Sequence, residues 1–298
     1  MYFDKVWFNG DIKNRDEVDV SPLSHSLHYG SGVFEGIRAY STSEGPAVFR
    51  LEDHIDRFFF SAKKLNYEIG FTKQEIIDGI KKILQENDVD QCYIRPLVFY
   101  GEKIGLVPGS NTEVNVLLAA IDMGKYLGSG KTKVKISDYI RLHPQTTETK
   151  AKLSGNYINS LLASQQAKRG GFDEALLLDY EGNIAEGSAQ NIFFVKDDKV
   201  FTPDSNSILP GITRDTVLEI CKNLEIETHL TNINSRDLED FEEAFFVGTA
   251  TEVNAINSIE DTEFDVEQNE ITQRISKDYK EIVRGQKDKY NEWLTIVN

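Results

Sequence analysis

Cysteine is scarce in this sequence. The 298 residues include two, Cys92 and Cys221, which lie far apart among apolar neighbours. We therefore expect two buried free thiols, and neither a disulfide framework nor a metal site. Free thiols are typical of a reducing compartment. The first residues also lack the basic start and apolar run of a signal peptide, so the sequence predicts a cytoplasmic protein.

Long apolar runs and an excess of positive charge are also missing. No stretch of about 18 apolar residues is present to form a membrane-spanning helix. Acidic residues outnumber basic ones by 49 to 33, and the formal net charge is -16. This charge repels nucleic acid and anionic membrane surfaces, so we expect neither as a partner. A small anion would bind only where local cations or helix N-termini reverse the overall field.

What is present is an alternation of strand and helix patterns, which in the first half begins with a hairpin signal at Asn9-Gly10. Apolar periodicity predicts a helix over 51–65 and another that starts from a capping-box pattern at Thr72. Strands are predicted at 47–51, 92–101 and 114–121. Pro96 indicates that the second of these strands lies at an edge, contains a bulge or has an interruption in its pairing.

The second half repeats the alternation. Strands are predicted at 133–137, 175–178, 191–195 and 244–247, and helices over 156–168, from 213 and over 271–282. The glycine-rich residues 124–132 predict a linker between a smaller N-terminal domain, 1–123, and a larger C-terminal domain, 133–298. The expected fold class is α+β, with a small-molecule site in the crevice between two domains.

Two clusters contain side chains that could carry chemistry. Lys152 lies in a lysine pair that precedes a small, polar helix start, with Tyr157 five residues later. A lysine is usually a solvated surface residue, but a desolvated amine becomes a nucleophile. Glu186 lies between two predicted strands. It could be exposed, or it could pair with the protonated nitrogen of a heterocyclic cofactor.

Two further clusters could bind an anion. Pro210 and Gly211 precede a predicted helix, where the N–H groups of Ile212 and Thr213 either form an anion site or are an ordinary helix start. Residues 247–252 read as a strand that ends in glycine and hydroxyl residues before a helix. This segment could add a phosphate contact or form a simple turn.

Six motifs together resemble the class IV aminotransferases, and specifically the branched-chain aminotransferases. They are Tyr29-Gly-Ser-Gly-Val-Phe-Glu-Gly-Ile-Arg38, Tyr93-Ile-Arg-Pro96, Lys152-Leu-Ser-Gly-Asn-Tyr157, Glu186-Gly-Ser-Ala-Gln-Asn191, Leu209-Pro-Gly-Ile-Thr-Arg214 and Gly248-Thr-Ala250. They occur in the order typical of the family. The resemblance implies a two-domain, fold-type IV enzyme that uses pyridoxal 5'-phosphate. It also implies reversible transfer of an amino group between L-leucine, L-isoleucine or L-valine and 2-oxoglutarate.

The resemblance also implies roles for single residues. Lys152, in the C-terminal domain, would be the catalytic lysine that joins the cofactor as a Schiff base, Glu186 would pair with the pyridine nitrogen, and Tyr157 would bond the phenolic oxygen. The remaining cofactor-binding residues, chiefly phosphate contacts, would be Arg57, Leu209, Gly211, Ile212, Thr213 and Thr249.

For the substrate, the resemblance implies two carboxylate sites and an apolar pocket. The residues implied in these contacts are Tyr29, Phe34, Arg38, Tyr93, Arg95, Tyr126, Thr249 and Ala250. Thr249, Ala250 and Tyr93 would receive the α-carboxylate, and Arg95 with the two other tyrosines would receive the distal one. Tyr29 would come from the partner subunit, which implies a homodimer or a higher homo-oligomer.

Two positions depart from the commonest family pattern. Gln190 replaces a second glutamate, and Met123 replaces an aromatic residue of the pocket. Two enzymes of the same fold remain alternatives, a D-amino-acid aminotransferase and aminodeoxychorismate lyase. A non-enzymatic protein that binds an anionic metabolite is a further alternative, although it leaves Lys152, Tyr157 and Glu186 without a joint purpose.

Overall fold

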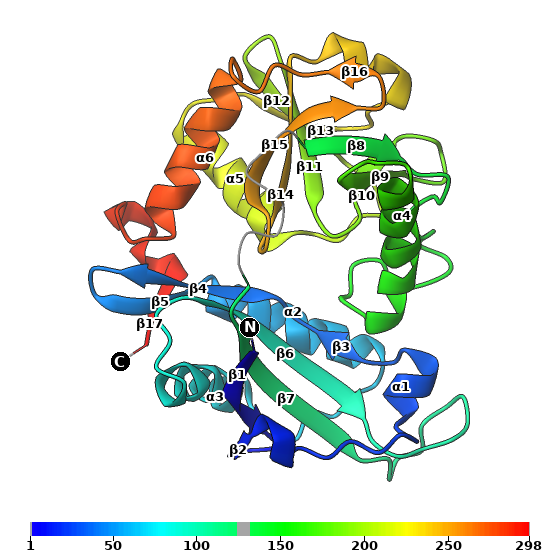
Figure 1. Cartoon of the computed structure of the whole chain (residues 1–298), viewed down its shortest axis with the longest axis vertical. Coiled ribbons are helices and arrows are strands. Elements are labelled where there is room, and N and C mark those ends of the chain that lie inside the picture. Colours follow the sequence, from blue (N-terminus) through cyan, green and yellow to red (C-terminus); the bar gives the residue numbers. More distant parts are fainter. Residues whose placement is uncertain (1, 124–131, 298) are drawn as a thin grey trace. The chain divides into compact units, whose positions relative to one another are not determined.

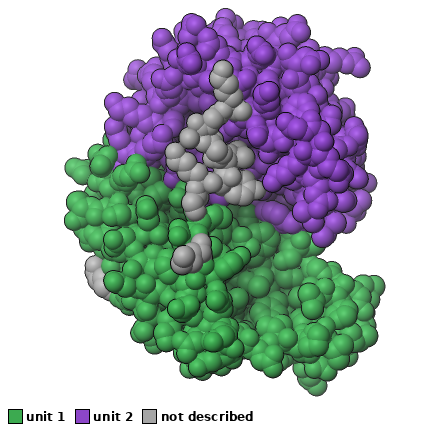
Figure 2. Space-filling view, in the orientation of Figure 1, with its two compact units in different colours: residues 1–124, 151–155, 282–298 green, residues 125–150, 156–281 purple. Residues whose placement is uncertain are grey.

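The computed structural model describes residues 2–123 and 132–297, which belong to two compact units (Figures 1 and 2). The first unit comprises residues 1–124, 151–155 and 282–298, and the second comprises residues 125–150 and 156–281. The predicted linker, 124–132, lies outside the described residues except for its last one. The units therefore differ from the predicted domains in two segments, because 151–155 and the carboxyl end pack with the first unit.

The first unit contains an eight-stranded sheet within its described residues. Its strands are β1 (Tyr2–Phe8), β2 (Asp11–Asn14), β3 (Val33–Phe34), β4 (Ile37–Thr42), β5 (Gly45–Phe49), β6 (Cys92–Tyr100), β7 (Val114–Ile121) and β17 (Leu294–Ile296). The order is β17-β5-β4-β6-β7-β1-β2, with β3 paired to β6. The helical segments are η1 (Arg15–Glu17), α1 (His25–Tyr29), α2 (Leu51–Lys64), α3 (Lys73–Glu86) and η4 (Asp288–Trp293), and η2 (Ser154–Asn156) spans the boundary between the units.

Local sequence accounts for the first half of this sheet. The hairpin prediction is confirmed: β1 pairs with β2, and Asn9 and Gly10 both have positive φ, as a two-residue turn of this kind requires. The capping box is also confirmed, since the Thr72 hydroxyl accepts from the Glu75 N–H at the start of α3. The apolar faces of α2 and α3 are buried in one core with the sheet.

Pro96 lies inside the sheet, so the edge alternative is wrong and the interruption is correct. β6 pairs with β7 from Tyr93 to Tyr100, and on its other side it pairs with β4 and β3. The gap between β3 and β4 is Glu35 and Gly36, opposite Pro96. The Glu35 N–H donates to the Pro96 carbonyl at 2.9 Å, but proline has no N–H to return the bond. The strand therefore breaks where proline faces it.

The second unit contains a nine-stranded sheet within its described residues. Its strands are β8 (Thr132–Ile136), β9 (Glu174–Leu178), β10 (Ile184–Gly187), β11 (Asn191–Lys196), β12 (Lys199–Pro203), β13 (Thr228–Thr231), β14 (Glu243–Gly248), β15 (Glu252–Ile259) and β16 (Thr262–Glu263). The order is β10-β9-β8-β15-β14-β11-β12-β13, with β16 paired to β15. The helical segments are α4 (Tyr157–Arg169), α5 (Ile212–Asn223), η3 (Ser235–Asp240) and α6 (Glu270–Ile282).

One predicted element of this unit is wrong. Gly248 is followed by a turn and then by strand β15, where a helix was expected. β14 and β15 form a hairpin in which Gly248 pairs with Glu252. Threonine and acidic residues favour helix starts and tight turns alike, because both use a side-chain oxygen near the backbone. The segment therefore has no helix N-terminus.

Both cysteines are buried free thiols, as predicted. Burial raises the pKa of Cys92 and of Cys221 to about 12. Both thiols are therefore protonated and unreactive in the folded protein at neutral pH. No helix among the described residues is long and apolar enough to cross a membrane.

Candidate functional site

In the first unit, Lys152 lies on a segment whose backbone is held on two sides. Its N–H donates to the Ser61 hydroxyl of α2 at 3.0 Å, and its carbonyl accepts from the Phe34 N–H at 3.2 Å. An isolated bridge pairs Leu153 with Val33. The Lys152 ammonium nitrogen lies 5.3 Å from the centre of the Phe34 ring. These contacts explain why the lysine packs with the N-terminal part of the chain.

Arg57, on α2, forms a buried ionic cluster with Glu35. Its Nε and one terminal nitrogen donate to the two Glu35 oxygens at 2.7 and 2.9 Å, and His54 Nδ1 contacts the same carboxylate at 2.8 Å. Glu35 is 0% exposed and His54 is 2% exposed. Burial alone would raise the pKa of Glu35, but the Arg57 charge and the hydrogen bonds from His54 and Arg57 hold it well below its usual range. Neither Glu35 nor His54 was predicted as a site residue.

Arg95 and Tyr93 lie on β6 beside Phe34. The Arg95 guanidinium lies over the Phe34 ring at 4.6 Å and the Tyr93 ring at 5.2 Å, and it donates to the Tyr93 hydroxyl at 3.0 Å. Its Nε is buried and has no partner among the described residues. A Cβ at Gly36 would collide with the Tyr93 hydroxyl and come within 2.8 Å of Cζ. Glycine at this position therefore makes room for the tyrosine.

Three other predicted substrate residues are less enclosed or are not described. Tyr29 ends α1, is 42% exposed, and accepts a hydrogen bond from the Gly105 N–H at 3.2 Å. Arg38, on β4, has its guanidinium over the Tyr40 ring at 5.2 Å. Tyr126 lies outside the described residues.

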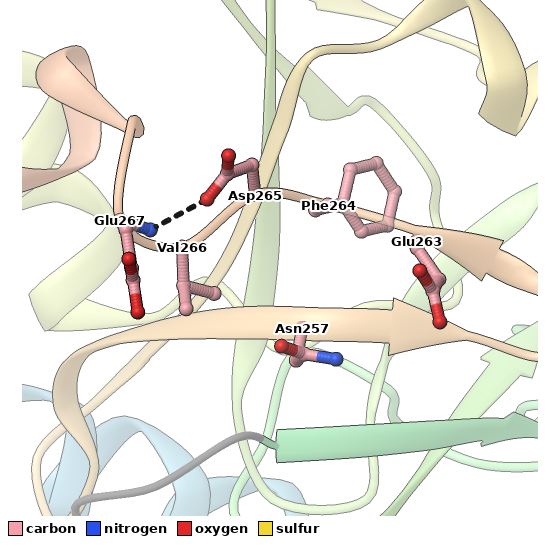
Figure 3. A pocket seen from close by; sticks show the side chains of 6 residues that line it. All are labelled: Asn257, Glu263, Phe264, Asp265, Val266 and Glu267. Atoms are coloured by element: carbon pink, nitrogen blue, oxygen red, sulfur yellow. Dashed lines mark hydrogen bonds between the residues drawn. The ribbon is translucent and has the colours of Figure 1, made fainter.

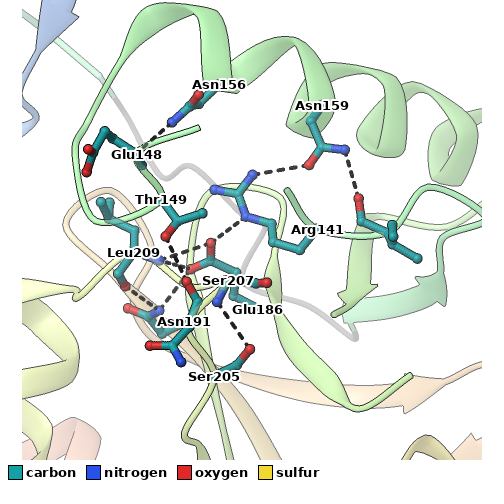
Figure 4. A network of polar contacts seen from close by, with 12 residues as sticks. Arg141, Glu148, Thr149, Asn156, Asn159, Glu186, Asn191, Ser205, Ser207 and Leu209 are labelled. Carbon is teal, nitrogen blue, oxygen red and sulfur yellow. Dashed lines mark hydrogen bonds and ion pairs between the residues drawn. The ribbon is translucent and has the colours of Figure 1, made fainter. Parts of the chain in front are cut away.

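In the second unit, Glu186 is the centre of a buried polar network (Figure 4). It lies on β10 and is 4% exposed, so the exposed-turn alternative is wrong. Arg141 Nε donates to one carboxylate oxygen at 2.6 Å, and Asn191 donates to the other at 3.0 Å. The Leu209 N–H lies 3.3 Å from both oxygens. Three donors thus fix the positions of the two Glu186 oxygens.

Arg141 is a residue that motif analysis missed. It precedes the Lys152 motif in a polar segment without a signature, and its partner Glu186 is 45 residues away. A buried arginine is rare unless it is paired. No local pattern marks it as buried, so only the folded chain identifies the pair.

The predicted helix start at Ile212 is confirmed. Gly211 is the N-cap of α5 and offers no side chain to accept the first N–H groups, those of Ile212 and Thr213. A Cβ at Gly211 would collide with the Asn191 side-chain oxygen. Asn191 also donates to the Leu209 carbonyl at 3.1 Å, so it links the helix start to Glu186.

Three predicted site residues, Tyr157, Thr249 and Ala250, lie at the ends of secondary-structure elements. Tyr157 is the first residue of α4, and Thr249 and Ala250 form the turn between β14 and β15. Gln190 is buried beside this turn: a Cβ on Gly248 would lie 3.3 Å from its Cβ. Its amide donates to Glu174 at 2.6 Å. A glutamate at position 190 would bring two buried carboxylates together, which explains the amide.

A separate cavity of about 510 Å³ contains none of the predicted site residues (Figure 3). It is lined by Asn257, Glu263, Phe264, Asp265, Val266 and Glu267. The Glu267 N–H donates to the Asp265 carboxylate at 3.0 Å. Among residues 2–123 and 132–297, no group of three or more His, Cys, Asp or Glu residues could hold a metal ion.

Known proteins resemble the chain over nearly its whole length. A family profile described as Amino-transferase class IV matches residues 32–259. The branched-chain-amino-acid aminotransferase of Pseudomonas aeruginosa is 38% identical over 98% of this chain and 97% of that protein. Crystal structures of the T.th. branched-chain amino acid aminotransferase are 40% identical and cover 99% of each chain. The complex with 4-methylvaleric acid has a TM-score of 0.95, and the complex with N-(5'-phosphopyridoxyl)-L-glutamate has a TM-score of 0.94.

Proposed function

The chain belongs to the class IV aminotransferases, and from this premise we propose that it transfers the amino group between branched-chain L-amino acids and 2-oxoglutarate. The substrates would be L-leucine, L-isoleucine and L-valine, and the products would be their 2-oxo acids and L-glutamate. One observation carries the proposal. The similar T.th. enzyme binds both 4-methylvaleric acid, which is the leucine skeleton without its amino group, and a phosphopyridoxyl adduct of glutamate.

The described residues fit pyridoxal 5'-phosphate by their donor chemistry. The N-terminus of α5 presents N–H groups without a capping side chain, which suits a phosphate in an otherwise acidic protein. Glu186 accepts three hydrogen bonds, which suits the ionised partner of a protonated pyridine nitrogen. We assign Arg57, Leu209, Gly211, Ile212, Thr213 and Thr249 to cofactor binding, chiefly to the phosphate, and Tyr157 to the phenolic oxygen.

When bound, this cofactor supplies an aldehyde that condenses with amines and a protonated ring that withdraws electrons from the substrate α-carbon. Lys152 would hold the cofactor between turnovers. Once displaced by the substrate amine, its own amine would accept the α-proton and deliver it to C4'. Glu186 would keep the ring nitrogen protonated by accepting its hydrogen bond.

We propose that Arg95 allows the site to accept two kinds of substrate side chain: it would pair with the distal carboxylate of glutamate, and aromatic rings would cover it when the side chain is apolar. Arg95 has a buried Nε without a partner among the described residues, so a bound carboxylate of glutamate would complete its hydrogen bonds. With a branched apolar side chain, the faces of Phe34 and Tyr93 already cover the guanidinium. Thr249, Ala250 and the Tyr93 hydroxyl would bind the α-carboxylate. Arg38 would also contact the substrate.

We also propose that the working form is a homodimer in the cytoplasm. Tyr29 would contribute to the partner's substrate site, and it lies beside a loop with two strongly exposed apolar residues, Leu106 and Val107. Such side chains commonly mark an interface. The two buried, reduced cysteines are compatible with a reducing compartment.

The test is a matched pair of lysine variants. Lys152→Ala should lower turnover of L-leucine with 2-oxoglutarate by more than about 10²-fold, because the base and the point of attachment are both removed. It should also lose the visible absorbance that the purified protein acquires with pyridoxal phosphate. Lys150→Ala, an exposed neighbour, should keep both properties. Borohydride reduction followed by peptide mass mapping should find the cofactor on Lys152.

Other outcomes separate the alternatives. A wild-type protein that stays colourless with pyridoxal phosphate would favour a non-enzymatic metabolite-binding protein. Turnover of D-alanine in place of L-leucine would favour the D-amino-acid enzyme. Release of pyruvate from aminodeoxychorismate without an oxo acid acceptor would favour the lyase.

A further inference from the structure

We propose that Arg141 is a positioning residue for this reaction: it keeps Glu186 ionised and fixed in one orientation. The inference rests on the proposed function, because the pyridine nitrogen is the group that Glu186 would pair with. Arg141 lies in the segment between β8 and the Lys152 motif. Its side chain is 8% exposed and that of Glu186 is 5% exposed, so the two charges face each other with little water.

The burial of Glu186 determines the role of Arg141. A carboxylate removed from water takes up a proton unless a cation or several donors stabilise its charge. Arginine remains charged at any pH at which the protein is folded, so it is a permanent partner. Arg214, another nearby cation, bonds to Thr202 and to the Pro203 carbonyl at 3.2 and 2.9 Å. Arg141, by contrast, is in direct contact with Glu186.

The orientation of Arg141 is itself fixed by Asn159 of α4 (Figure 4). The Asn159 side-chain oxygen accepts from the second Arg141 nitrogen at 3.1 Å, and its amide donates to the Ile140 carbonyl at 2.9 Å. The Arg141 N–H donates to the Leu178 carbonyl of β9 at 2.7 Å. One asparagine thus holds both the guanidinium and the peptide that carries it. Strand β9 and helix α4 together therefore hold Arg141 in place, and Arg141 in turn holds the Glu186 oxygen that it contacts.

The two side-chain donors to Glu186 fix the orientation of its carboxylate. Arg141 takes one oxygen of Glu186 and Asn191 takes the other, so the carboxylate cannot rotate without breaking a hydrogen bond. A fixed carboxylate offers its remaining lone pairs in fixed directions, as an acceptor for a ring N–H requires. The charge of the arginine also makes the pair neutral overall. A neutral pair moderates how strongly Glu186 stabilises the protonated ring.

The experiment compares Arg141→Met with the same change at an exposed arginine, Arg236→Met. By analogy with residues that orient metal ligands, Arg141→Met should weaken pyridoxal phosphate binding and lower kcat by roughly 10- to 100-fold. Affinity is measured by titrating the apoprotein and following quenching of its intrinsic fluorescence. The absorption maximum of the bound cofactor should shift in the same direction as in a Glu186→Gln variant measured alongside. Arg236→Met should match wild type in all three measurements.

Two further variants distinguish positioning from mere structural support. Arg141→Lys should recover part of the affinity, since the ammonium keeps the charge but loses the planar fork. In a Glu186→Gln background, Arg141→Met should change kcat by less than about twofold, because its effect acts through the carboxylate. If Arg141→Met fails to fold, Asn159→Ala, which leaves the charge in place, should still weaken cofactor affinity and shift the absorption maximum.

Two results would overturn the inference while leaving the proposed function intact. One is a wild-type protein that transaminates while Arg141→Met retains its affinity and absorption maximum. The other is an equal loss of kcat in the wild-type and Glu186→Gln backgrounds. Failure of the wild type itself to bind pyridoxal phosphate would instead remove the proposed function.

Discussion

At the scale of single residues, buried charges occur in compensated groups. Glu35 is shared between Arg57 and His54, Glu186 is shared among Arg141, Asn191 and a backbone N–H, and Glu174 is paired with the amide of Gln190. Each unit thus carries its own buried carboxylate with an arginine partner. An unpaired buried carboxylate would be protonated, so these partners determine which acids keep their charge.

His54 should make stability depend on pH. Burial lowers its pKa from the usual 6.5, even though the hydrogen bond and charge of Glu35 act in the opposite direction. Below about pH 6.5 the unfolded chain therefore binds a proton that the folded protein resists, so the free energy of unfolding falls as pH falls. Between pH 7 and pH 5.5, the free energy of unfolding of His54→Gln should therefore fall by up to about 1 kcal/mol less than that of the wild type.

Urea unfolding at the two pH values measures this difference. His28→Gln, at an exposed histidine, is the control and should follow the wild-type pH dependence. Identical pH dependence in His54→Gln and wild type would contradict the prediction. The pKa of Glu35 is held well below its usual 4.5, so protonation of Glu35 lowers the free energy of unfolding only in more acidic solution.

Sequence reasoning at this scale identified residues that lie in motifs and missed those defined by their partners. Lys152, Tyr157 and Glu186 stand in segments that resemble a family, and their roles remain proposals. Arg141 and Glu35 acquire their meaning only from partners 45 and 22 residues away. Glu35 even lies within a quoted motif, but its burial beside Arg57 depends on the packing of α2 against the sheet.

At the scale of elements, the break between β3 and β4 shapes the substrate residues. Pro96 interrupts the pairing, and Gly36, in the break, leaves the space that the Tyr93 hydroxyl fills. A single interrupted strand therefore places Phe34, on its first half, beside the Arg95 guanidinium.

Gly36→Ala should disturb this arrangement. The added methyl group would displace the Tyr93 ring, at a cost of about 1–3 kcal/mol in the free energy of unfolding. It should also raise KM, because the Tyr93 hydroxyl is proposed to bind the α-carboxylate. Gly70→Ala is the matched control, since a Cβ there meets nothing within 4 Å. Equal thermal midpoints and equal KM values for the two variants would refute this explanation.

Elements with many periodic residues were predictable, and very short ones were not. Helices α2, α3, α5 and α6 follow from apolar spacing, as do strands β6, β7, β11 and β14. Strands β3, β16 and β17 contain two, two and three residues, which is too few for any pattern to appear. The helix expected after Gly248 is absent because its hydroxyl residues close a hairpin.

At the scale of the whole molecule, exposed apolar residues on α1 and on the loop that contacts it bear on assembly. Leu27, Leu106 and Val107 are 71%, 77% and 77% exposed. The loop that carries Leu106 and Val107 contacts α1, the helix that carries Leu27: His25 Nε2 contacts the Leu106 carbonyl at 3.2 Å, and the Tyr29 hydroxyl accepts from the Gly105 N–H at 3.2 Å. The same loop holds Tyr29, the residue that would contribute to the partner's substrate site in the proposed homodimer.

Leu106→Asp should therefore shift the protein towards monomers. A charge in a buried interface opposes association, while an exposed site in the isolated chain tolerates it. Sedimentation velocity should show a smaller species, and activity should fall because Tyr29 no longer reaches the partner's site. Leu230→Asp, at an exposed apolar position on β13, should leave the assembly unchanged. An unchanged sedimentation coefficient for Leu106→Asp would exclude this loop from the interface.

The first unit is built from segments that lie far apart in the sequence, and this affects when it can fold. Strand β17 pairs with β5 through residues Leu294 to Ile296, although most of the described chain separates the two strands in sequence. During synthesis β5 is therefore made long before its partner strand emerges from the ribosome. The edge of the amino-terminal sheet at β5 must stay open until β17 has been made. A nascent chain stalled before β17 should remain sensitive to protease at β5, although the sequence around β5 is made early.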